Sequence, residues 1–205
     1  MLKKLFFILS FWIYSDMCLA LIPEPGIVKN CSATPSLWAD KSPKSFLTSS
    51  DLRRSPGSSV FISGQNIVIF GRVLDERCIP LAAAKVNIWQ QHPHQNISND
   101  KDPSYLTGSI TTDNLGNFSF YTIMPLKEKN IEQSIHFHIS HPDVLDFETQ
   151  MFFSKNIGDA DLLKDLSEQE KASLTAICAN CEDQEVIDKY YFQIIVPGVG
   201  HYKEY

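Results

Sequence analysis

Residues 134–140 alternate strictly between polar and apolar side chains, and this pattern constrains the fold more than any other segment. Successive side chains of a β-strand point to opposite faces, so the three apolar residues are expected to face a core while His136 and His138 share the other face. Two imidazoles whose Cα atoms are about 6.5 Å apart can bind one metal ion. The segment predicts a half-buried strand carrying half of a metal site. A strand whose polar face merely carries two histidines is the alternative.

Five other short segments carry strand signals and are separated by turn residues, at 67–74, 85–89, 117–122, 148–153 and 190–196. Short strands with little helix predict an all-β chain folded as an antiparallel β-sandwich. The polar stretch 90–109 is expected to be a long loop on which a site could be built.

One short helical insertion is expected near the C-terminus. Ser167 and Glu170 have the spacing of a capping box, in which each side chain hydrogen-bonds the other residue's backbone amide. The apolar residues that follow predict a helix running through Leu174 and Ile177.

The first twenty residues have the three parts of a secretory signal peptide. Lys3 and Lys4 precede an apolar run at 5–14, and Cys18 and Ala20 supply small residues for a cleavage site. The run is too short for a membrane span, which needs about 20 apolar residues. We expect an exported protein, periplasmic or secreted, and an uncleaved membrane anchor is the alternative.

The rest of the chain divides by composition. Residues 21–63 are rich in Pro, Ser and Lys and are expected to form an extended N-terminal arm, whereas residues 64–205 carry the sandwich domain. Removing residues 1–20 takes away two lysines and one aspartate, so the formal net charge changes from −6 to −7. An acidic chain without a basic stripe is a poor candidate for binding nucleic acid.

Four cysteines would remain after cleavage, and an even number is typical of exported proteins with disulfides. Of the three possible pairings we expect Cys31 with Cys78, because Cys178 and Cys181 form a tight C-x-x-C unit that can close on itself. A zinc site built from all four thiolates is another option. A thioredoxin-like redox role is disfavoured because the C-x-x-C follows the predicted helix instead of opening one.

Six short blocks follow one another between about residues 31 and 160. They are Gly71–Asp75, Cys78–Pro80, Ala84–Gln90, Thr112–Pro125, His136–His138 and Thr149–Phe153. Their order resembles the intradiol ring-cleavage dioxygenases, which include the catechol 1,2-dioxygenases and the protocatechuate 3,4-dioxygenases. The resemblance implies a β-sandwich with a non-haem Fe(III) ion held by two tyrosines and two histidines. It also implies a catechol-like aromatic substrate, O2 as co-substrate, and the possibility of a homo-oligomer.

The resemblance implies that His136 and His138 are iron ligands and that Gln150 matches a glutamine near the family's active site. Both tyrosine positions are unmatched, because residues 96–98 are Asn-Ile-Ser and residues 126–135 contain no tyrosine. Gln133 stands where the family has an arginine that positions the substrate.

Tyr105 is the nearest substitute for a missing ligand and is our candidate third metal ligand. Tyr121 is a weaker one, since it alternates with core-type phenylalanines. His92 and His94 could instead supply imidazoles from the long loop, although a solvated pair is the simpler interpretation. Phenolate and imidazole groups both suit Fe(III), and a displaceable ligand would open a position for substrate.

These observations favour an exported, divergent intradiol-type dioxygenase. The first alternative is an inactive descendant in which the sandwich binds a small molecule or a partner protein. The second is a purely structural sandwich stabilised by disulfides.

Overall fold

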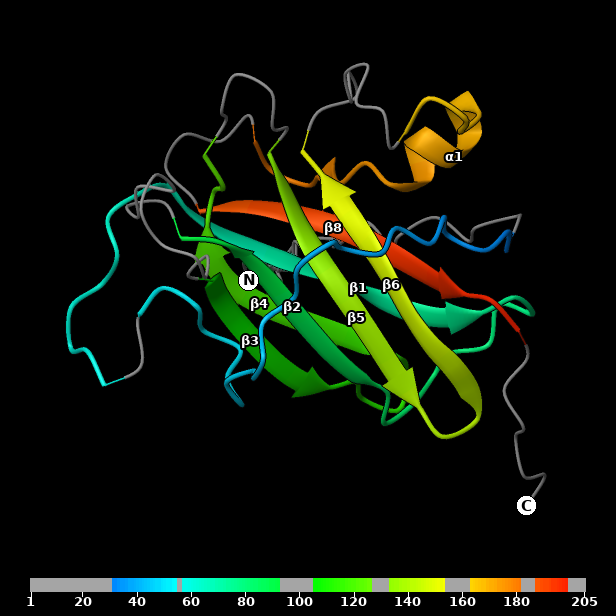
Figure 1. The fold of residues 1–205 in the computed structure, drawn as a ribbon, viewed down its shortest axis with the longest axis horizontal. Coiled ribbons are helices and arrows are strands. Elements are labelled where there is room, and N and C mark those ends of the chain that lie inside the picture. Colours follow the sequence, from blue (N-terminus) through cyan, green and yellow to red (C-terminus); the bar gives the residue numbers. More distant parts are fainter. Residues whose placement is uncertain are drawn as a thin grey trace, which may run out of the picture.

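The computed structural model describes residues 31–54, 57–92, 105–126, 133–153, 163–181 and 187–198. Two four-stranded sheets pack face to face, as the prediction of an all-β sandwich requires (Figure 1). Sheet A has the order β4-β1-β8-β7 and sheet B the order β3-β2-β5-β6. The elements are β1 (Asn66–Asp75), β2 (Lys85–Gln91), β3 (Tyr105–Thr111), β4 (Asn117–Ile123), β5 (Ser134–His141), β6 (Val144–Phe152), α1 (Glu168–Ser173), β7 (Ile177–Cys178) and β8 (Asp188–Val196).

Two details of the strand prediction were wrong. Strand β3 occupies part of the expected loop 90–109, and the short β7 was not predicted. Strands β1 and β8 pair in parallel, so sheet A is mixed, while every other strand pair is antiparallel among the described residues. The parallel pair joins segments far apart in sequence, and no local pattern reports such pairing.

The core lies between the sheets and is built from the apolar positions of the alternating strands. Ile135, Phe137 and Ile139 of β5 are fully buried there, and the ring of Phe137 packs on Phe192 of β8 with centroids 5.2 Å apart. The buried side of β5 is therefore occupied by hydrocarbon. Its polar side chains must lie on the opposite, outer face of sheet B.

The helix α1 begins where the capping box predicts. The Ser167 hydroxyl accepts a hydrogen bond from the Glu170 amide at 3.3 Å, and the Glu170 carboxylate accepts one from the Ser167 amide at 2.7 Å. The prediction that the helix runs to Ile177 was wrong, because α1 ends at Ser173 with Leu174 as its C-cap, and the chain then enters β7. Within the described part of the chain, no helix is long and apolar enough to cross a membrane.

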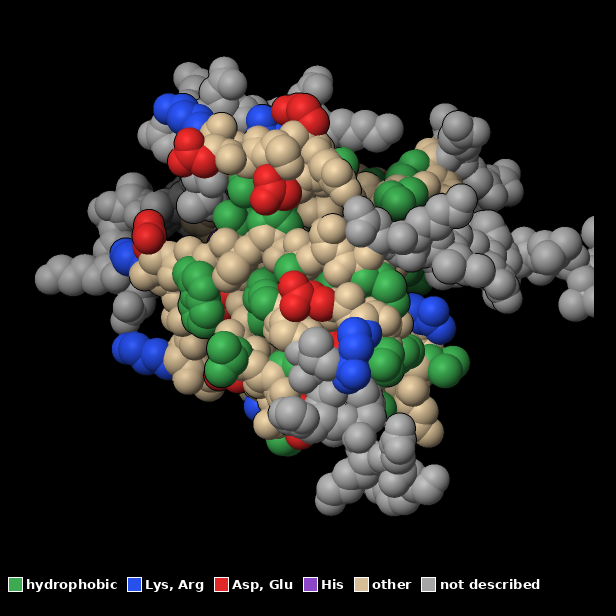
Figure 2. Space-filling view, turned by 90° about the vertical axis from the view of Figure 1, so that its right-hand side faces the viewer, with side chains coloured by type: hydrophobic (Ala, Val, Ile, Leu, Met, Phe, Trp, Pro, Cys, Tyr) green, Lys and Arg blue, Asp and Glu red, His purple; other side chains and the backbone are tan. Residues whose placement is uncertain are grey.

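Charged side chains of both signs are interspersed with uncharged surface on the side of the molecule that carries α1 (Figure 2). No histidine is visible among the residues drawn in colour there. The predicted signal peptide, residues 1–20, lies outside the described residues.

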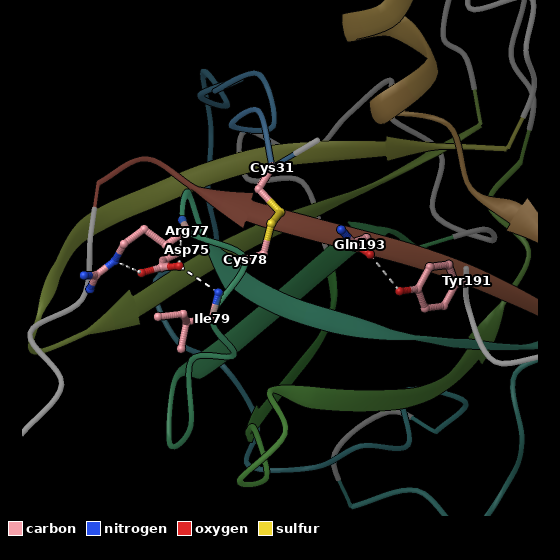
Figure 3. Close-up of a disulfide and its surroundings, with 7 residues drawn as sticks. All are labelled: Cys31, Asp75, Arg77, Cys78, Ile79, Tyr191 and Gln193. Carbon is pink, nitrogen blue, oxygen red and sulfur yellow. Dashed lines mark hydrogen bonds and ion pairs between the residues drawn. A yellow bond between two sulfur atoms is a disulfide. The ribbon is translucent and has the colours of Figure 1, made fainter. Parts of the chain in front are cut away.

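Both expected disulfides are present, Cys31–Cys78 and Cys178–Cys181. The first joins the arm to the turn after β1, where the fully buried carboxylate of Asp75 accepts hydrogen bonds from the amides of Arg77 and Ile79, each at 2.9 Å (Figure 3). The carboxylate thus holds the turn that presents Cys78 to the arm.

Residues 31–54 cross the outer face of sheet B as a strap (Figure 1). The strap starts beside sheet A, where the Thr34 amide donates to the Ile195 carbonyl at 2.9 Å. It then bonds β6 through the Leu37 amide and the Glu148 carbonyl at 3.0 Å. It returns to sheet A where the Leu52 amide donates to the backbone carbonyl of Tyr121 at 2.8 Å. The outer face of sheet B is therefore covered by the chain's own N-terminal segment.

Candidate metal centre

His136 and His138 lie on β5, between β2 and β6 near the middle of sheet B. Both are partly buried and both occupy the outer face, since the residues that alternate with them are in the core. Cross-strand pairing places Trp89 and Gln150 on either side of His136, and Asn87 and Glu148 on either side of His138. The two imidazoles are therefore flanked by side chains from both neighbouring strands.

His136 stacks on an aromatic wall. Its ring lies 5.0 Å from that of Trp89 and almost parallel to it, at 11°. Phe46 of the strap contacts Trp89 edge-on, with ring centroids 5.7 Å apart. Burial lowers the pKa of His136 to about 4. The imidazole is thus neutral near pH 7, which is the form that binds metals.

The two nitrogens of His138 have different surroundings. Nδ1 lies 3.3 Å from the amide nitrogen of Asn87, whose side chain is buried. Nε2 lies 3.6 Å from a carboxylate oxygen of Asp146, which is largely exposed. One nitrogen therefore faces the sheet and the other faces outward.

Three buried side-chain atoms of the described residues have no hydrogen-bond partner, and all three lie on this face. They are Oδ1 of Asn87, Nε1 of Trp89 and Nδ1 of His136. An unsatisfied buried polar atom costs about 1 to 3 kcal/mol, so such atoms are rare unless a site uses them. All three of these atoms lie around the histidine pair, where a bound ligand could pair with them.

Tyr105 begins β3 and shares the outer face of sheet B with the histidines, because it pairs with Gln91, two residues from Trp89. Its hydroxyl donates to the Lys41 carbonyl at 3.5 Å, and burial raises the pKa of the phenol. Trp89 lies on the strand between Tyr105 and His136. The structure therefore places Tyr105 on the correct face but does not bring its hydroxyl to the histidines.

The two glutamines singled out from the sequence lie at the same end of β5. Gln150 is the cross-strand partner of His136, and its amide donates to the Ser134 hydroxyl at 2.6 Å. Gln133 precedes β5 and donates to the Pro125 carbonyl at 2.7 Å. Gln150 is thus adjacent to a histidine, whereas Gln133 ties the start of β5 to the end of the β4 segment.

The remaining sequence candidates lie elsewhere. Tyr121 is on sheet A, below the guanidinium of Arg53 at 5.1 Å from its ring. His92 follows the end of β2 and is half-buried, while His94 lies outside the described residues. A separate groove of about 610 Å³ lies between Ser32–Thr34, α1 and β8. Tyr121 and the groove therefore lie apart from the histidine pair.

Sequence reasoning missed Asn87, Trp89 and the covering residue Phe46. The first two could have been found from their alternation with the buried Val86 and Ile88, which puts them on one outer face of β2. That they adjoin the histidines depends on the pairing of β2 with β5, which the alternation does not contain.

Comparison with known proteins identifies the family. The sequence model of a family described as "Dioxygenase" matches residues 47–198, which include both histidines. The chain belongs to the dioxygenase family. Two relatives named "Putative dioxygenase", from Rickettsia felis and Rickettsia bellii, are 28% and 27% identical to it over 97% of each chain.

Solved structures of intradiol ring-cleavage dioxygenases share the fold of this chain. The fold is similar to that of 3-chlorocatechol 1,2-dioxygenase from Rhodococcus opacus 1CP, with a TM-score of 0.62 and 19% identity over 83% of this chain and 75% of that one. It is similar to an intradiol ring-cleavage dioxygenase from Tetranychus urticae, with a TM-score of 0.62 and 16% identity over 82% and 95%.

The intradiol family typically uses non-haem Fe(III), for which the resemblance implies two histidine and two tyrosine ligands. The described residues include candidates for the two histidines. The histidine pair fits an ion, because both imidazoles share a covered face and His136 is neutral with an unpartnered Nδ1. The phenolate half is unmatched in sequence. Within the described ranges, no group of three His, Cys, Asp or Glu side chains could hold a metal. Any further protein ligand must therefore come from a different residue type or from elsewhere in the chain.

Proposed function

We propose that this protein is an exported ring-cleavage dioxygenase of the intradiol type, which uses non-haem Fe(III) and O2 to open a catechol-like aromatic ring. The observation that carries the proposal is the pair His136 and His138 on one covered face of a sandwich that belongs to this family. The leader-like residues 1–20 and the two disulfides support export, because disulfides persist in oxidising compartments.

His136 and His138 would hold the iron through ring nitrogens. Tyr105 would supply a phenolate after its hydroxyl leaves the Lys41 carbonyl. Because burial raises the pKa of this phenol, it would lose its proton only beside a cation such as the iron. Bound iron would supply the Lewis acidity that makes a coordinated catechol reactive toward O2.

The side chains around the histidines have their own roles in this proposal. Trp89 and Phe46 form an aromatic wall that limits the access of water to His136. Gln150 and Gln133 would position the substrate, because an amide can both donate to and accept from a catechol hydroxyl. Gln150 is the closer of the two in strand pairing, as the direct neighbour of His136.

A direct test is O2 uptake by the iron-reconstituted protein supplied with catechol. We expect consumption of O2 with formation of the ring-opened dicarboxylic acid. His136→Ala and His138→Ala should each abolish the O2 uptake. His141→Ala is the matched control, since His141 is on the same strand but contacts the Ala82 carbonyl at 3.1 Å. Absence of O2 uptake despite bound iron would refute the proposal.

A binding module without catalysis is the second candidate. It is favoured by the two unmatched tyrosines and by the strap contacts that cover the histidine face, including Ala39, whose amide bonds the Glu148 carboxylate at 3.2 Å. Binding of a catechol to metal-free protein, with no iron uptake, would support this candidate against the enzyme.

A further inference from the structure

We propose that Asn87 selects which nitrogen of His138 carries the proton, and thereby controls whether that histidine can bind a metal ion. The proposal rests on the proposed function in one respect, which is that His138 is a metal ligand. Asn87 lies opposite His138 on the neighbouring strand β2, and only 5% of the residue is exposed. It would act through His138, so it is a positioning residue.

The geometry leaves one nitrogen of His138 for a metal. Nδ1 lies 3.3 Å from the buried amide of Asn87, while Nε2 faces the exposed carboxylate of Asp146 at 3.6 Å. A neutral imidazole has one N–H and one lone pair. A metal that approaches from the outer side meets Nε2, and it can bind only if the proton is on Nδ1.

The amide of Asn87 favours the other tautomer in the orientation observed. Its Nδ2 group lies 3.3 Å from Nδ1 of His138, and a hydrogen bond between them forms when Nδ1 accepts, which puts the proton of a neutral His138 on Nε2, toward Asp146. In this arrangement Oδ1 of Asn87 is buried without a partner. In that tautomer His138 cannot bind a metal through Nε2.

Rotation of the Asn87 amide by about 180° exchanges its acceptor and donor atoms. Oδ1 would then accept from Nδ1–H of His138, and the lone pair on Nε2 would become free. Metal-ligating histidines generally donate their second N–H to such an acceptor, which fixes the tautomer and strengthens the ligand. His136 differs, because its Nδ1 is buried without a hydrogen bond among the described residues and is itself open to a metal. The role assigned to Asn87 therefore concerns the tautomer of His138 alone.

Two variants separate these roles. Asn87→Asp keeps the shape but offers only acceptor oxygens, so it should hold His138 as the Nδ1–H tautomer without metal. Asn87→Leu keeps similar bulk and removes both the donor and the acceptor. Ser140→Ala is the matched control, because Ser140 lies on the same face of β5, two residues beyond His138.

The experiment is ¹⁵N NMR of the imidazoles in the full-length, metal-free protein at about pH 8, where an ordinary histidine is neutral. It is combined with titration of Zn(II) as a redox-inert probe. Wild-type protein and Ser140→Ala should show the Nε2–H tautomer of His138, and Asn87→Asp the Nδ1–H tautomer. Zn(II) affinity should fall by about 10- to 100-fold in Asn87→Leu but be retained in Asn87→Asp.

An Nε2–H tautomer in Asn87→Asp, or Zn(II) affinity in Asn87→Leu within about twofold of wild type, would overturn the proposal. If wild-type protein binds no metal, the proposed function and the metal-binding role of Asn87 both fail. The tautomer comparison between wild type and Asn87→Asp still shows in that case whether Asn87 sets the proton position.

Discussion

Removing the disulfide between Cys31 and Cys78 is expected to destabilise the protein far more than removing the one between Cys178 and Cys181. The first bridge joins residues 47 positions apart and the second joins residues 3 apart. The chain-entropy relation for a cross-linked unfolded chain gives a contribution of about 4 kcal/mol for the long loop and about 2 kcal/mol for the short one. The same chemical change should therefore have two different effects.

The structure adds a reason for the larger effect. Cys31 stands at the start of the strap that covers the histidine face, so its bond to Cys78 fixes one end of that strap. Alanine should replace both cysteines of a pair, which avoids free thiols. Alanine at position 78 also keeps a Cβ at a residue whose φ is +63°, so the backbone strain at that position is the same in both proteins.

The free energy of unfolding is measured by urea denaturation of wild type and of the two double variants, with tryptophan fluorescence as the signal. Trp89 is 1% exposed and contacts Phe46 of the strap, so it reports loosening of the strap as well as unfolding. Equal losses in the two double variants, or a loss below about 2 kcal/mol for the Cys31/Cys78 pair, would refute the loop-length reasoning.

Three further predictions concern stability. Because burial lowers the pKa of His136 to about 4, the unfolded metal-free chain binds its proton at higher pH than the folded one, so stability should fall by up to about 3 kcal/mol as pH falls from about 6.5 to 4. Urea unfolding at both ends of that range should show this component in wild type and not in His136→Gln; an unchanged pH dependence would contradict it. Gly71→Ala should cost about 3 kcal/mol or more, measured by thermal or urea unfolding, because the new Cβ would overlap the Phe192 carbonyl and meet the Phe118 ring at 2.8 Å. Ser167→Ala should cost about 1 kcal/mol through loss of the α1 cap, and a change near zero in the same assay would mean that this cap adds nothing to global stability.

The strands that the sequence predicted are short runs rich in apolar residues between turn signals, and the alternation is clearest in β5. Strand β3 was missed because Gly108 occupies one of its core-facing positions, where a Cβ would meet Leu52 at 2.6 Å and Phe120 at 3.1 Å. A glycine required by close packing looks like a turn signal in the sequence. The helix was placed correctly at its start, where the cap is local, and too long at its end, where pairing of β7 with β8 takes over.

The candidate site, like the fold, was predictable where it depends on a single strand. Alternation alone put His136 and His138 on one face, because that property belongs to a single strand. The neighbours Asn87 and Trp89 depend on the pairing between β2 and β5, and Phe46 depends on the path of the strap across sheet B. Properties that arise from pairing distant segments could not be read from local patterns.

The most direct test of the central claim is the iron content of the purified protein, recorded together with its visible spectrum. The account predicts stoichiometric iron that is lost in His136→Ala and His138→Ala and kept in His141→Ala. Tyr105→Phe should keep the iron and lose the charge-transfer colour of a phenolate bound to Fe(III). Wild-type protein that binds no iron, or that retains it without His136 and His138, would contradict the account.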